Sequence, residues 1–139
     1  MKIAGVVAAA IFLALALLHA YWALGGRGAA GAVIPERGGA ALFRPGRLAT
    51  WGVAIALVCA AAIVLGRIGC WSLPAGMFPF KVGCWTLAVV FAARAVGDFR
   101  YLGFFKRERA SRFAQYDSRF YSPLCLALAI VCAAVAAKG

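Results

Sequence analysis

The sequence is poor in acidic residues and has a single histidine. Four of its 139 residues are aspartate or glutamate, against fifteen lysines and arginines. One histidine with scattered carboxylates fits none of the ligand spacings of common metal sites, so we expect no metal centre. The five cysteines include no CxxC motif, which argues against a redox relay. The GGRG stretch at residues 25–28 follows no predicted strand and lacks the GK[ST] of a phosphate loop, so it does not indicate nucleotide binding.

Long apolar runs dominate the chain instead. Hydrophobic residues make up 65% of it and the mean hydropathy is +0.92, values that exclude an ordinary soluble domain. Four apolar segments lie at about residues 3–24, 48–66, 78–98 and 120–137, and a membrane-spanning helix needs roughly 20 residues. The first is longer than the apolar part of a usual signal peptide, so we expect it to remain as a helix. The sequence therefore predicts an all-α fold, one integral membrane domain over residues 1–139, built as a four-transmembrane-helix bundle.

The basic residues are divided unequally between the two sides that four spans would create. The side with both termini would carry Lys2, Arg67, Lys81 and Lys138. The other side would carry ten basic residues in two loops: Arg27, Arg37, Arg44, Arg47, Arg100, Lys106, Arg107, Arg109, Arg112 and Arg119. The positive-inside rule then predicts a bacterial inner-membrane protein with both termini on the periplasmic side and both basic loops in the cytoplasm. This explains the net charge of +11 without nucleic acid, and the partner we expect is a bilayer that contains anionic lipid.

Residues 99–121, between the third and fourth segments, mix aromatic side chains with six basic ones. Two interpretations stay open: an amphipathic helix lying in the headgroup region of the membrane, or an ordinary basic loop with aromatic anchors. Ser122 and Pro123 predict the start of the fourth helix, since serine caps helices and proline suits their first turn.

Ionisable residues are expected to converge at the cytoplasmic ends of the spans. Arg94 and Asp98 are four residues apart, so a continuous helix would place them on one face, where they could form an ion pair. Ionisable groups within a span are functional candidates by default. His19 is predicted at the same depth, and a histidine beside a carboxylate can transfer protons. The structural interpretation is that Arg94 extends to the headgroups and Asp98 serves as its counter-ion.

The cysteines divide by their predicted depth. Cys59, Cys125 and Cys132 lie within apolar segments, where small apolar packing is the default role. Cys70 and Cys84 each precede a tryptophan and follow a glycine, at the two ends of the predicted outer loop. In an oxidising periplasm these two residues could form a disulfide, which we predict.

Four stretches of the sequence together resemble a family of small four-helix bacterial membrane proteins that is classed as a domain of unknown function. They are LLHAYWALGG (17–26), LFRPGRLAT (42–50), ARAVGDFRYLGFFKR (93–107) and FAQYDSRFYSPLCLAL (113–128). The resemblance implies a four-helix protein of the bacterial inner membrane, but no substrate, cofactor or reaction. The residues that fall inside the family's pattern are His19, Trp22, Arg94, Gly97, Asp98, Arg100, Tyr101, Asp117 and Tyr121.

We therefore predict a polar pocket on the cytoplasmic side that binds a lipid or an amphiphilic small molecule. Its candidate ligand-binding residues are His19, Trp22, Arg94, Asp98, Arg100, Tyr101, Asp117 and Tyr121. One alternative is an accessory or structural subunit of a larger membrane complex. Another is a membrane-embedded enzyme or proton-coupled carrier that uses His19 and Asp98 as acid and base. Because four helices enclose little volume, a carrier would require a homo-oligomer.

Overall fold

The protein consists of four long helices joined by loops. The computed structural model describes residues 1–26, 28, 34, 36–37, 40–41, 45–73 and 76–138. The first three long helices are α1 (Lys2–Ala23), α3 (Arg47–Arg67) and α4 (Phe78–Val96). The fourth runs from Arg112 to Ala137, and all four are long and apolar enough to cross a membrane. The predicted all-α architecture with four spans is confirmed.

The fourth helix has three sections: α5 (Arg112–Tyr116), a π-helical turn η1 (Asp117–Tyr121) and α6 (Ser122–Ala137). Its cap is Ser111, whose Oγ accepts a hydrogen bond from the Ala114 N–H at 3.1 Å. The predicted start at Ser122 and Pro123 coincides with the start of α6, but the predicted capping role of Ser122 is wrong, because helical structure already precedes it. The Ser122 N–H bonds to the Asp117 carbonyl five residues back, so the serine lies inside the helix.

The loop between α4 and the fourth helix contains no helix over residues 97–111. The amphipathic helix considered for residues 99–121 is thus not formed as a separate element: its first half is irregular and its second half extends the fourth span. In the loop between α1 and α3, the two short strands β1 (Glu36–Arg37) and β2 (Ala40–Ala41) pair antiparallel, with Glu36 opposite Ala41.

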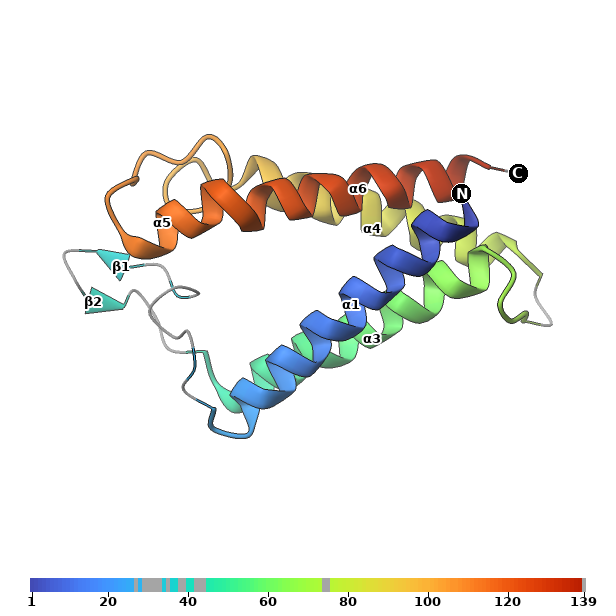
Figure 1. Ribbon diagram of the computed structural model, residues 1–139, viewed down its shortest axis with the longest axis horizontal. Coiled ribbons are helices and arrows are strands. Elements are labelled where there is room, and N and C mark those ends of the chain that lie inside the picture. Colours follow the sequence, from blue (N-terminus) through green and yellow to red (C-terminus); the bar gives the residue numbers. More distant parts are fainter. Residues whose placement is uncertain are drawn as a thin grey trace.

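The long helices form two antiparallel pairs, α1 with α3 and α4 with α6. Figure 1 shows the two pairs meeting near the chain termini and diverging toward the other end, so that they form two arms. We call the end with the termini the terminal end. We call the opposite end, which carries the loops after α1 and after α4, the basic end. Both termini lie at this end, as an even number of crossings requires.

The shared core of the four helices lies in the half nearest the terminal end. Its fully buried side chains include Phe12 of α1, Val64 of α3, Cys84 of α4 and Cys132 of α6. The Phe12 and Phe91 rings, with centroids 5.2 Å apart, join the two arms. Small residues allow the helices of one arm to approach closely, as at Gly5, where an added Cβ would lie 2.8 Å from Ile68 Cγ2. The outward faces carry exposed aliphatic side chains, which suits contact with lipid.

The predicted disulfide is not formed in the structure, because Cys70 and Cys84 are both free thiols. Cys84 lies more than one turn inside α4 and is fully buried in the shared core. Cys70 is exposed beyond the end of α3. The sequence places both residues at the ends of the outer loop. In the structure α4 begins at Phe78, so Cys84 lies within the helix, on the face that packs into the core.

Candidate functional site at the basic end

Gly97 ends α4, and this separates Arg94 from Asp98. Gly97 has φ +88°, a left-handed value that glycine adopts without strain. Asp98 therefore lies outside the helix and is exposed. The predicted ion pair between Arg94 and Asp98 is not formed, since the residues do not share a helical face.

Asp98 instead closes a tight loop through its side chain. Its Oδ1 accepts hydrogen bonds from the N–H groups of Arg100, Tyr101 and Leu102 at 2.9, 2.7 and 2.9 Å. Slight burial opposes ionisation of this carboxyl, but the three backbone donors outweigh it and hold the pKa of Asp98 below its ordinary value. Phe99, inside the turn, has φ +61°. The ionised carboxylate organises backbone that would otherwise leave these N–H groups to water.

The partner of Arg94 is Asp117, on the π-helical turn of the neighbouring helix. Arg94 Nη2 lies 2.8 Å from Asp117 Oδ1, and Asp117 is fully buried. The other oxygen, Oδ2, accepts from the Gly103 N–H at 2.8 Å, from Lys106 Nζ at 2.9 Å and from Ser122 Oγ at 3.2 Å. One carboxylate therefore joins α4, the loop and the fourth helix.

Lys106 is the functional-site residue that sequence reasoning missed. The sequence places it among the basic residues of the loop, yet only 2% of it is exposed. Its ammonium donates to the Gly103 carbonyl at 2.9 Å and to Ser118 Oγ at 2.7 Å, in addition to Asp117. The sequence carries one indirect signal. With few acidic residues in the chain, each carboxylate near several basic residues is a candidate partner for a buried cation. The network holds two cations and one carboxylate, and Arg94 Nη1 is buried without a hydrogen-bond partner.

Glycine at position 103 is required by the same network. Gly103 has φ +84°, and a Cβ there would collide with the backbone of Val96 and Gly97. The Phe104 N–H donates to the Ala95 carbonyl at 2.9 Å, so the loop folds back onto the end of α4. This close approach brings the Gly103 N–H to Asp117.

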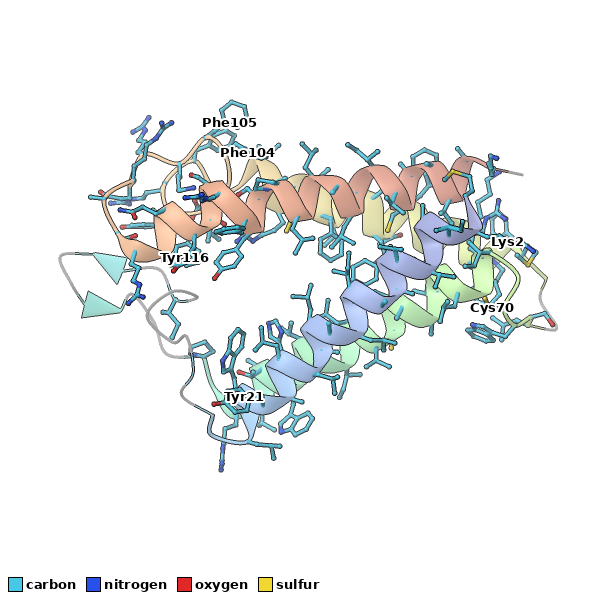
Figure 2. All side chains as sticks on the ribbon, viewed as in Figure 1. Lys2, Tyr21, Cys70, Phe104, Phe105 and Tyr116 are labelled. Carbon is cyan, nitrogen blue, oxygen red and sulfur yellow. The ribbon has the colours of Figure 1, made fainter. Side chains whose placement is uncertain are left out.

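His19 and Trp22 belong to the other arm. His19 Nδ1 is hydrogen-bonded to the Leu15 carbonyl at 2.8 Å, and its ring packs edge-on against Trp22 with centroids 5.2 Å apart. Trp22 Nε1 donates to the Gly28 carbonyl at 2.9 Å. Figure 2 shows Tyr21, their neighbour in α1, near the tip of one arm and Tyr116 on the other. In the described part of the chain no hydrogen bond joins His19 to Arg94, Asp98 or Asp117.

The remaining predicted residues lie on the arm of α4 and α6. The Arg100 guanidinium lies over the Tyr101 ring, 5.3 Å from its centroid. The Tyr121 ring is 6.1 Å from that of Phe113 and 6.5 Å from that of Tyr116, measured between centroids. Among the described residues, no group of three His, Cys, Asp or Glu side chains could hold a metal ion.

An open pocket lies on the outside of the folded-back loop. Its volume is about 420 Å³, and it is lined by Asp98, Phe99, Arg100, Arg107 and Glu108. The Glu108 N–H donates to the Arg100 carbonyl at 3.0 Å, which fixes the two sides of the pocket relative to each other. We call this the loop pocket. The predicted candidates Asp98 and Arg100 line it, whereas Arg94 and Asp117 form the support beneath the loop.

Exposed aromatic side chains accompany the loop pocket. Phe99 and Phe105 are 59% and 63% exposed, with ring centroids 6.3 Å apart. Phe104 and Phe105 lie on the outer side of the arm in Figure 2. Aromatic rings beside arginines at the end of a span are typical of the interface between a membrane and water.

The sequence model of one protein family matches residues 12–132, and its description is "Protein of unknown function (DUF3995)". No curated protein and no solved structure matches the chain.

Proposed function

The chain belongs to the DUF3995 family of proteins of unknown function, and from this premise we propose that it is a lipid-binding membrane protein. The loop pocket would bind the phosphate of a lipid headgroup through Arg100 and Arg107. The observation that supports this most is the location of the pocket, which begins two residues beyond the end of α4. Charged side chains at this depth lie among lipid headgroups.

The length of the fourth helix supports the same depth. Its 26 residues extend over about 39 Å, which exceeds a hydrocarbon core of about 30 Å. The part of the helix that exceeds this thickness can project from the membrane at the basic end. Asp117 would then lie near the boundary between the hydrocarbon core and the headgroups. The loop pocket, held by Asp117 through Gly103, then lies at or just outside the surface of the hydrocarbon.

The orientation that we propose follows from the basic loops. The basic end would face the cytoplasm of a bacterium and both termini the periplasm, by the positive-inside rule. A reporter active only in the periplasm, fused after Lys138, should give a signal. A signal from a cytoplasmic reporter at the same position would reverse the orientation.

The acid–base alternative loses its geometric support. His19 and Asp98 are each hydrogen-bonded within their own segment, and they belong to different arms. Apolar outer faces suit lipid as well as a larger complex, so the accessory-subunit alternative gains no specific observation.

Lipid binding can be tested with the purified protein in a mild detergent. Native mass spectrometry would count bound molecules of a short-chain phospholipid across a titration. Arg107→Gln should weaken binding up to about fivefold, the scale of one exposed ion pair. Arg112→Gln is the matched control, because it removes the same charge from the same end but does not line the pocket. Equal binding by both variants would overturn the proposal.

A further inference from the structure

The loop pocket carries charges of both signs. Resting on the proposed lipid binding, we infer that it takes a zwitterionic headgroup, a phosphate diester joined to a primary ammonium. Arg100 and Arg107 would bind the phosphate, and Glu108 with Asp98 would bind the ammonium. Two arginines and two carboxylates line one pocket, which matches the charges of such a headgroup. A purely anionic headgroup would meet the carboxylates as well as the arginines.

The oppositely charged side chains of the loop pocket do not form ion pairs with one another. Among the described residues, ion pairs within 4 Å involve only Arg94, Lys106 and Asp117. No side-chain hydrogen bond in the described chain involves Arg107 or Glu108. These side chains are exposed and stand near each other without pairing. They are therefore free to bind a ligand that supplies both charges.

The backbone holds the two sides of the pocket in place. Asp98 Oδ1 binds three N–H groups on one side, and the Glu108 N–H bonds to the Arg100 carbonyl across the loop. The buried pair of Lys106 and Asp117 lies behind this loop and fixes the residue before Arg107. A backbone held by such contacts loses little conformational entropy when a ligand binds, so the cost of ordering falls on the exposed side chains.

A primary ammonium fits these carboxylates better than a quaternary one. It has three N–H donors that carboxylate oxygens can accept, whereas a trimethylated nitrogen has none and is bound through aromatic faces. The pocket volume of about 420 Å³ lies within the range of roughly 300–1,000 Å³ that is typical of small-ligand sites. Two carboxylates and one aromatic ring, Phe99, line the pocket, so its chemistry favours an ethanolamine headgroup, and its volume can hold one.

The experiment uses native mass spectrometry of the intact protein with dioctanoyl phosphatidylethanolamine, phosphatidylcholine and phosphatidylglycerol. The wild type should bind the ethanolamine lipid up to about fivefold more tightly than the other two. Glu108→Gln should remove this preference without weakening the binding of phosphatidylglycerol. Glu36→Gln, which removes the same charge from the other loop, should keep it. Arg107→Gln should weaken the binding of all three lipids.

The outcomes separate this inference from the proposed function. If Arg107→Gln weakens all three lipids but Glu108→Gln leaves their order unchanged, the zwitterionic assignment is overturned while lipid binding stands. If Arg107→Gln changes nothing, both are overturned. Soluble phosphoethanolamine, added as a competitor, distinguishes the source of the headgroup. Displacement of the lipid at equal concentration would identify a free amino phosphate as the ligand, and no displacement would confirm the lipid.

Discussion

Replacing Asp117 with alanine should destabilise the protein more than any other single polar substitution. The carboxylate is fully buried and accepts hydrogen bonds from Arg94, Gly103, Lys106 and Ser122. Without it, the Lys106 ammonium, whose side chain is 1% exposed, loses its only ionic partner in the described chain. Breaking a buried pair in this way costs about 3–5 kcal/mol. Arg94 adds less, because its side chain is 31% exposed and can turn toward water.

Asp98→Ala provides the comparison, because the sequence predicts Asp98 as the acidic partner of Arg94. This residue is exposed, and the three N–H groups that it releases can bond to water. The loss should be about 1 kcal/mol, as for a helix cap. We therefore expect Asp117→Ala to cost more than Asp98→Ala, although the sequence pairs Arg94 with Asp98.

A double-mutant cycle separates the energy of the Lys106–Asp117 pair from that of the rest of the network. Lys106→Met and Asp117→Asn should each destabilise the protein, because each leaves the other charge buried. The double variant should lose less free energy of unfolding than the two single variants lose in sum. The difference should be about 1–3 kcal/mol, because residues in one network couple.

The assay is equilibrium unfolding in mixed micelles of a mild detergent and dodecyl sulfate, followed by helical circular dichroism. The reasoning is refuted if Asp117→Ala costs no more than Asp98→Ala. It is equally refuted if the two changes at Lys106 and Asp117 add without coupling.

Three further outcomes are expected. Gly103→Ala should destabilise the protein in the same unfolding assay, because the added Cβ would collide with the backbone at the end of α4. Gly52→Ala is the control: it has open space around it and should stabilise the protein by about 0.5–1 kcal/mol. Thiol titration of the denatured, unreduced protein should find five free thiols, and three would show that one disulfide has formed. The lowered pKa of Asp98 means that its carboxylate stabilises the loop above the unfolded pKa of about 3.9 and loses that effect as the pH falls through the folded value. The protection of the loop amides, measured relative to their intrinsic exchange rate at each pH, should therefore fall more at low pH in the wild type than in the Asp98→Asn variant.

The sequence by itself determined the membrane class and the number of spans. Long apolar runs must become helices in lipid, because every backbone N–H and C=O has to be satisfied within the segment. The first three helices accordingly begin and end within about two residues of the predicted limits.

The tertiary structure alone decided how the polar residues pair. Arg94 and Asp98 satisfy the helical spacing, but Gly97 ends the helix between them, and the left-handed conformation there depends on the contact with the returning loop. Asp117 and Lys106 are eleven residues apart on an irregular path, so no local periodicity brings them together. A buried ion pair of this kind forms only when the chain around it excludes water. Local spacing predicts helices in lipid because their hydrogen bonds are local, whereas charge pairing at the membrane edge depends on contacts between distant segments.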